Sequence, residues 1–256
     1  VVGFGSLGTI NSCGRYEIRQ ILSHTEAAGV PTTFTLTQSP VNTYNINANS
    51  SVQIISFRQY GAPNYTTTAA MSSKKWDGNT GGVLAFYVPG TLTLAHNLDA
   101  NTDGFRGAGP NNDGASAGCS GASNYRVITQ NNFADKGEGI FLRTTANQAA
   151  GMGRILNGGG GGNSHNGGGG GGGNFTAGGD GGPGFSGSAT GCNPSAGGLG
   201  GLSLNGSIDV TRIFMGGGGG AGERGRGPRH RDADVVAGGH RIRAGGCGQD
   251  HAVPGG

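Results

Sequence analysis

The feature that most constrains this chain is the concentration of glycine in its second half. More than half of the 59 glycines among 256 residues fall in 151–222, in runs at 158–162, 167–173 and 216–220. Glycine loses more backbone entropy on folding than any other residue and brings no side chain to bury. If this stretch folds, main-chain hydrogen bonds and close contact between neighbouring backbones must hold it.

Few arrangements meet that requirement. Polyproline-II-like helices have about three residues per turn and no internal hydrogen bonds, so all their amides can bond to neighbouring strands. Collagen is excluded because the strict G-X-Y period is absent and the chain has only 9 prolines. We therefore predict that 151–222 forms a glycine-rich, polyglycine II-like body or tightly stacked strands.

The residues before 150 have the pattern of a β protein. Thr32–Leu36 alternates Thr with apolar residues, which is typical of a half-buried strand. Gly82–Tyr87 is a continuous apolar run between turn residues, which favours a strand buried on both faces. We expect a mainly β fold, in which an N-terminal β-helix or sandwich-like part (1–150) packs on the glycine-rich body (151–222).

A third segment, 223–256, is a basic glycine-rich tail with a high density of Arg and His. One interpretation is a basic patch for an anionic partner. The others are a solvated terminal segment or an error in the sequence, so the tail's role stays open.

Charge and composition narrow the class of protein. Charged residues make up 12% of the chain and the net charge is +3, too weak and scattered a basicity to predict a nucleic-acid partner. The abundance of Asn, Thr, Ser and Gly is typical of secreted bacterial β proteins. No membrane span or signal peptide is visible. Because the chain opens at Val1, we interpret it as a processed or truncated product.

The four cysteines are widely spaced and none forms a CxxC pair. They are Cys13, Cys119, Cys192 and Cys247. An even number at such spacing predicts two disulfides in an oxidising compartment, with all three connectivities open, and free thiols are the alternative.

Several motifs resemble a family of secreted glycine-rich bacterial surface or extracellular proteins, most of them uncharacterised. The resemblance covers most of 40–222, and the sequences that carry it include QIISFRQY at 53–60, WDGNTGGV at 76–83, GFRG at 104–107, KGEGI at 136–140, NGGGGGNS at 157–164 and RIFMGGGGGA at 212–221. It implies export and a β-rich, β-helical fold, and no catalytic residues. In composition alone, the glycine runs are also similar to phage tail adhesins built from polyglycine helices.

One segment has the start of a calcium-binding loop. Asp99, Asn101 and Asp103 precede Gly104 in the order D-x-N-x-D-G, and alternating oxygen ligands suit a hard cation. A full EF-hand is excluded because Pro110 stands where the loop needs Glu. The alternative interpretation is an Asx-rich turn. Calcium is the one cofactor that the sequence suggests.

Trp76 is the single tryptophan, and Asp77 and Asn79 follow it. A tryptophan beside such polar groups can form a stacking platform for a sugar, whereas a structural role in a small core is the competing interpretation.

No constellation of residues identifies a catalytic site, so we expect no enzyme. The leading expectation is a non-enzymatic extracellular structural or adhesive protein that self-associates as a fibre subunit. The alternative is an adhesin tip that binds a receptor or glycan on a cell surface.

Overall fold

The regular secondary structure of this protein is sparse and almost entirely extended. The computed structural model describes residues 10–47, 50–109, 124–126, 133–143, 149–163, 167–183 and 197–222. In these ranges the elements are β1 (Ile21–Ala27), β2 (Val30–Leu36), β3 (Tyr65–Thr66), β4 (Met71–Ser72), β5 (Leu92–Thr93), β6 (Leu98–Asp99) and the 3-10 helix η1 (Asn205–Ser207). The prediction of a mainly non-helical, β-leaning chain is confirmed.

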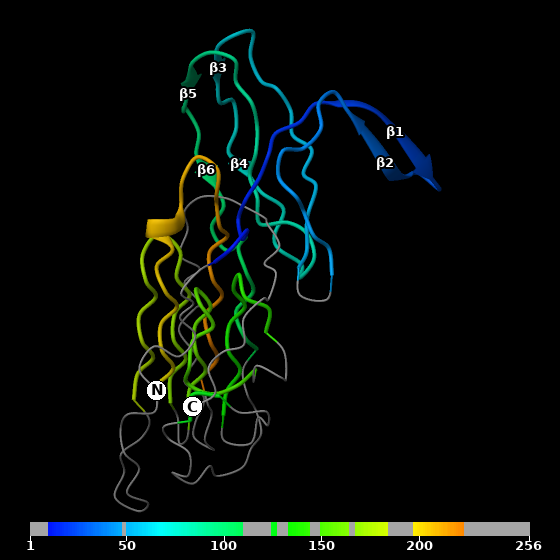
Figure 1. Cartoon of the computed structure of the whole chain (residues 1–256). Coiled ribbons are helices and arrows are strands. Elements are labelled where there is room, and N and C mark those ends of the chain that lie inside the picture. Colours follow the sequence, from blue (N-terminus) through cyan, green and yellow to red (C-terminus); the bar gives the residue numbers. More distant parts are fainter. Residues whose placement is uncertain are drawn as a thin grey trace, which may run out of the picture.

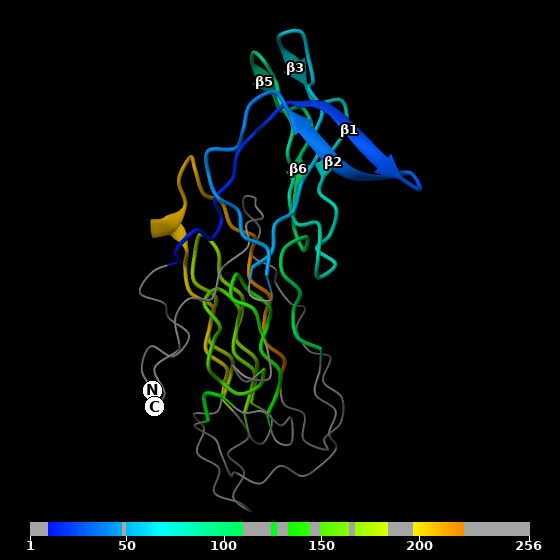
Figure 2. The ribbon, with the colours of Figure 1, turned by 45° about the vertical axis from the view of Figure 1, so that its right-hand side comes forward.

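The two long strands form an arm that projects from the rest of the molecule (Figures 1 and 2). We call β1, its turn and β2 the arm. β1 and β2 pair antiparallel, and the turn residues Ala28 and Gly29 both have positive φ, 52° and 75°. Two residues of this kind make the type I′ turn, whose twist matches that of a hairpin. The predicted strand at Thr32–Leu36 lies within β2 and is confirmed, but its predicted half-burial is wrong, because every residue of β2 except Leu36 is exposed.

Residues 53–103 form what we call the stacked region, in which the second half of the segment lies alongside the first. Tyr65 pairs with Leu92 and Met71 with Leu98, both in parallel and both 27 residues further along the chain (65 to 92, 71 to 98). The amide of Trp76 also donates across the two halves, to the carbonyl of Asp103 at 3.0 Å. The register differs by one residue at Gln59, which bridges in parallel to Tyr87, 28 residues further along.

One strand prediction in this region is wrong. Gly82–Tyr87 contains no strand; Tyr87 forms a single parallel bridge to Gln59 and is 51% exposed. At the start of this run, Gly81 and Gly82 both have positive φ, so the backbone there does not have the conformation of a strand. The apolar run is therefore mostly part-buried and is not a strand buried on both faces.

The rest of the described chain forms an elongated bundle of extended segments below the stacked region (Figures 1 and 2). We call it the glycine body: residues 104–109, 133–143, 149–163, 167–183 and 197–222. Its segments are joined by backbone hydrogen bonds, for example from Gly137 to Gly159 and from Phe105 to Gly216. Residues 104–109 and 133–143 thus bond to glycine segments although they precede the proposed boundary at 150.

Hydrogen bonds in the glycine body recur with a period of three residues. Successive amides at 159–162 donate to three different neighbouring segments before returning to the first; the accepting carbonyls, in order, are Gly218, Leu199, Gly151 and Ala221. The distances are 2.8–2.9 Å. A central segment is therefore bonded on three sides.

The centre of the glycine body is packed backbone against backbone. Residues 155–163 are all buried, and most of them are glycine. A Cβ atom added to Gly217 would overlap the carbonyl oxygen of Asn157, and one added to Gly160 would overlap that of Met152. Glycine is required at these positions because the neighbouring chain occupies the space of a side chain.

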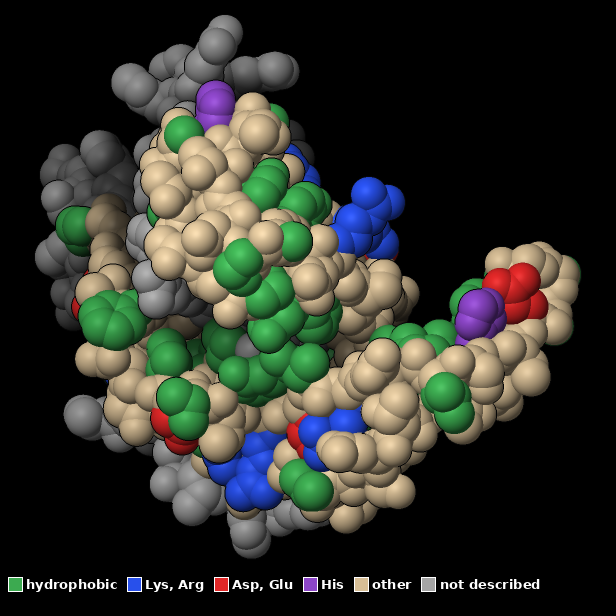
Figure 3. All heavy atoms as spheres, turned by 90° about the horizontal axis from the view of Figure 1, so that it is seen from above, with side chains coloured by type: hydrophobic (Ala, Val, Ile, Leu, Met, Phe, Trp, Pro, Cys, Tyr) green, Lys and Arg blue, Asp and Glu red, His purple; other side chains and the backbone are tan. Residues whose placement is uncertain are grey.

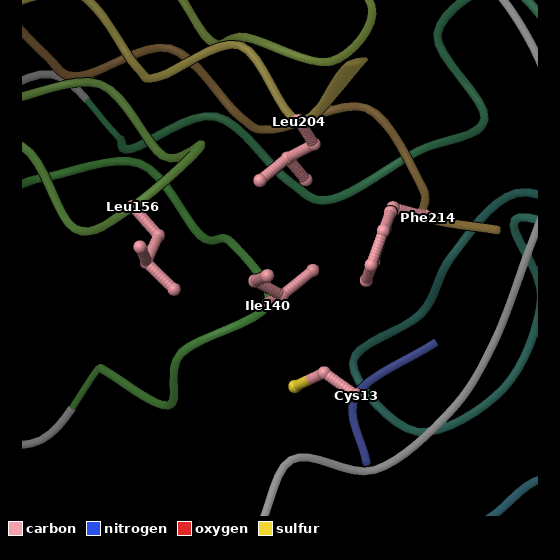
Figure 4. Close-up of a cluster of buried hydrophobic side chains, with 5 residues drawn as sticks. All are labelled: Cys13, Ile140, Leu156, Leu204 and Phe214. Carbon is pink, nitrogen blue, oxygen red and sulfur yellow. The ribbon is translucent and has the colours of Figure 1, made fainter. Parts of the chain in front are cut away.

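A small apolar cluster caps the upper end of the body, where it meets the N-terminal residues (Figure 4). Its buried members are Cys13, Ile140, Leu156, Leu204 and Phe214. Leu204 and Phe214 come from the segment 197–222 and the other three from three further parts of the chain, so the cluster connects four parts of the chain. Other buried apolar residues of the body, among them Phe133, Met152 and Met215, lie outside this cluster.

Candidate functional site

The most elaborate side-chain network of the described residues lies where the stacked region meets the glycine body. The carboxylate of Glu138 accepts a hydrogen bond from Trp76 Nε1 at 3.2 Å and from the backbone amide of Arg106 at 3.1 Å. The Arg106 guanidinium donates to Glu138 Oε1 through Nε at 3.0 Å and also through Nη2. Glu138 therefore joins a side chain of the stacked region to two segments of the body.

Asp77 organises an exposed turn next to this network. Its Oδ1 accepts from the backbone amides of Asn79 and Thr80 at 2.9 and 2.8 Å, and its Oδ2 accepts from Lys74 Nζ at 2.6 Å. The hydrogen bond from Lys74, followed by those two amides, holds the pKa of Asp77 well below its usual range. The carbonyl of Asp77 accepts from Arg106 Nη1 at 3.2 Å, which connects the turn to Glu138.

The structure thus brings together two of the three residues predicted to bind a ligand, Trp76 and Asp77. The Trp76 ring is half-buried and meets the Phe105 ring edge to face, with centroids 5.6 Å apart. Since its indole nitrogen is also bonded to Glu138, the ring is fixed in place. Asn79 is exposed and contributes its backbone amide to Asp77. Sugar binding here stays a prediction.

The predicted calcium ligands lie on one turn, but each carboxylate already has a hydrogen-bond partner. Asp99 Oδ1 accepts from the amide of Asn101 at 2.8 Å, the arrangement of an Asx turn. Asp103 is 5% exposed and its Oδ2 accepts from Ser73 Oγ at 2.5 Å. Asp103 thus connects the two halves of the stacked region. Calcium binding stays a prediction that isothermal titration of the chain with Ca²⁺ can test.

A buried lysine is the most perturbed basic group in the described part of the chain. Lys136 is 0% exposed and its Nζ donates to the carbonyl of Tyr125. Burial, and secondarily the charge of Arg126, lowers the pKa of Lys136 to about 7. The carbonyl of Lys136 accepts from Arg143 Nη1 at 2.5 Å, and Arg143 lies 3.9 Å from Asp135. This group anchors residues 124–126 to the body.

Cys13 is disulfide-bonded, as predicted for one of the four cysteines. Cys119, Cys192 and Cys247 lie outside the described residues, as does the whole tail 223–256, so the connectivity stays a prediction.

Arg106, Phe105 and Glu138 were not identified as site residues from the sequence. The sequence did contain a signal for the two charged residues of this site. Charged residues are only 12% of the chain, and Arg106 and Glu138 lie in GFRG and KGEGI, two of the motifs on which the resemblance was based. The motif that contains Trp76 meets both of them in space. The three motifs therefore mark one junction.

No protein-family model, curated protein or solved structure matches this chain. Across the described ranges no group of three or more His, Cys, Asp or Glu side chains is placed to hold a metal ion. Within those same ranges, none of the helical structure has the length and apolar character needed to cross a bilayer.

Proposed function

We propose that this protein is a non-enzymatic extracellular structural or adhesive component whose glycine body is a rigid shaft of polyglycine II-type helices. The observation that carries the proposal is the three-residue period of the hydrogen bonds at 159–162. A helix with about three residues per turn directs successive amides to three sides, so it bonds to several neighbours at once. An α-helix or a β-strand does not produce this pattern.

Other segments support the same interpretation. Gly168 and Gly171 donate to Gly182 and Gly179, again three residues apart. In that neighbouring segment, Cβ atoms on Gly178 and Gly181 would overlap backbone atoms, whereas Gly179 and Gly182 face open space. Both the bonding and the packing therefore repeat every third residue.

We further propose that the stacked region is a short β-helix-like unit of two coils. The parallel pairs Tyr65–Leu92 and Met71–Leu98, both offset by 27 residues, and the parallel bridge Gln59–Tyr87, offset by 28, support it. Repeating coils stack through such in-register pairs, and usually at least three are needed to bury a continuous core. A two-coil unit leaves apolar residues uncovered, and Figure 3 shows apolar side chains on this end of the molecule. Ile54 is 70% exposed and Leu94 57%.

The shaft proposal is tested by amide hydrogen exchange on the full chain. We expect slow exchange at 158–162 and at Gly217, Gly218 and Gly220, because these amides donate to backbone carbonyls within the body. Exchange at the rate of an unstructured peptide would overturn the shaft proposal.

Electron microscopy of the purified protein over a concentration series tests the fibre role. Particles that stay separate at every concentration argue against that role.

The second candidate function is a tip that binds a receptor or carbohydrate. The half-buried Trp76 ring beside the exposed turn at Asp77–Thr80 favours it. A glycan array probed with the wild-type chain and with Trp76→Ala tests this function. Saturable binding that Trp76→Ala abolishes supports it, and the absence of binding by the wild type removes it.

A further inference from the structure

The arm has no packing partner in the described structure. Every residue of β1 is exposed, and so is every residue of β2 except Leu36, which is partly exposed. Among the strands, β1 and β2 contact only each other. Leu22 is 70% exposed and Val30 63%. An isolated two-stranded hairpin is at best marginally stable in water. The arm would therefore gain stability from a partner that covers its apolar side chains and pairs with its open strand edges.

The two edges of the arm differ in their capacity to pair. Ala27 and Val30 flank the two-residue turn, and such a flanking pair exchanges its hydrogen bonds across the hairpin. The hydrogen-bonding groups of the next pair, Glu26 and Pro31, therefore point outward. Proline has no amide hydrogen, so the outer edge of β2 lacks a donor, whereas β1 presents one at Glu26.

Charge indicates what kind of partner fits this edge. No Asp, Glu, Lys, Arg or His occurs from Ala27 to Phe57. The two ionisable groups of β1 satisfy each other, since His24 Nε2 lies 2.8 Å from Glu26 Oε1. Natural edge strands are commonly protected by lysine, other charges or bulges; β1 carries only this one mutually paired His24–Glu26 and a register irregularity between Ile21 and Ser23. A strongly charged partner finds no complement here, and an identical arm meets no repulsion.

We propose that β1 pairs antiparallel with β1 of a second copy of this chain, so that two arms form one four-stranded sheet about a two-fold axis. An isologous contact uses the same surface on both copies and closes at two. If the axis passes near His24, the middle of β1, Glu26 of one copy lies near Leu22 of the other, where β1 has a register irregularity, and not opposite its own counterpart. This inference rests on the structural role proposed above, for which the dimer is the building unit, and a fibre requires a second contact elsewhere.

Sedimentation velocity of the full chain over a concentration series tests the proposal. We expect a wild-type monomer–dimer equilibrium that Glu26→Pro weakens by about tenfold or more, because it removes the outward donor of β1. Glu26→Gln is the matched control: it keeps the amide and loses only the charge, and it should dimerise like the wild type.

A second variant keeps the test valid if Glu26→Pro distorts the hairpin. Pro31→Thr gives β2 an outward donor, so a dimer with two open edges should extend into larger assemblies. A wild type that stays monomeric assigns the arm to another partner and overturns the proposal. It is also overturned if both variants sediment like the wild type. The amide exchange of the glycine runs reports on the shaft separately, so either proposal can fail alone.

Discussion

The glycine body and the arm both consist of extended backbone, yet the hydrogen-bonding groups of that backbone find their partners in opposite ways. In the body each segment is surrounded by other segments, and the contacts are so close that a Cβ on Gly160 or Gly217 has no room. In the arm one strand has one neighbour, and side chains such as Leu22 and Val30 stand in solvent. The comparison teaches that removing side chains lets backbone pair in three directions, whereas keeping them limits pairing to the plane of a sheet.

The largest expected effect breaks the body at its centre. Gly217→Ala places a methyl group on the carbonyl oxygen of Asn157, and backbone must move to accept it. We expect a loss of more than about 3 kcal/mol in the free energy of unfolding, measured by chemical denaturation. Gly179→Ala is the control because nothing lies near its added Cβ. An equal loss in both variants would contradict backbone-to-backbone packing.

The next effect concerns the side chain that joins the body's segments. Asn157 is 0% exposed; its Oδ1 accepts from the amide of Ile140 at 2.9 Å and its Nδ2 donates to the carbonyl of Met215 at 3.0 Å. Asn157→Ala leaves both groups buried without this partner, which should cost about 2–3 kcal/mol in thermal or chemical unfolding. The exposed Asn205→Ala should change stability by less than about 0.5 kcal/mol. A neutral Asn157→Ala would show that the two segments are held without it.

A pH dependence sharpens the comparison, because the buried lysine belongs to the body alone. The pKa of Lys136 is lowered from 10.5 to about 7 in the folded chain. Between these values the unfolded chain binds more protons, so this lysine makes stability rise with pH above 7. The contribution is about 1.4 kcal/mol per pH unit, and Lys136→Met should remove it from unfolding curves measured between pH 7 and 9. The exposed Lys75→Met should keep the wild-type slope.

The smallest expected effect is at the tip of the arm. Ala28 takes φ of 52°, a region that costs a residue with a Cβ about 1 kcal/mol and costs glycine little. Ala28→Gly should therefore slow the local amide exchange of the arm by about threefold to fivefold and leave the exchange of the glycine body unchanged. Faster exchange in the arm would contradict the type I′ turn. Thr37→Gly, beyond the end of β2, is a control without such a turn.

The sequence predicted the features that depend on local pattern. The alternation at Thr32–Leu36 correctly predicted a strand, whereas the hairpin turn at Ala28 and Gly29 was seen only in the structure. The glycine runs correctly indicated a part of the chain held by main-chain hydrogen bonds. These properties follow from which backbone angles and contacts each residue type permits.

The features that depend on distant partners could not be predicted in this way. Glu138 meets Trp76 across 62 residues and Arg106 across 32, and nothing near either residue specifies that contact. The Gly82–Tyr87 prediction failed because an apolar run alone does not show whether the backbone has a pairing partner on both sides. Repeats with weak side-chain similarity, such as the 27-residue offset, become visible only once the chain is folded.

The outer segment at 178–182 has a consequence for how such a protein can diversify. Gly178 and Gly181 are closed to substitution by their neighbours, while Gly179 and Gly182 face open space and Asp180 between them already carries a side chain. Gly179 and Gly182 can therefore accept side chains without disturbing the interior, whereas the Asp180 carboxylate already accepts from the amide of Gly200 at 2.7 Å. A charged or crosslinking residue could therefore be placed at Gly179 or Gly182 on the outer face of the glycine body, which makes this segment suitable for engineering.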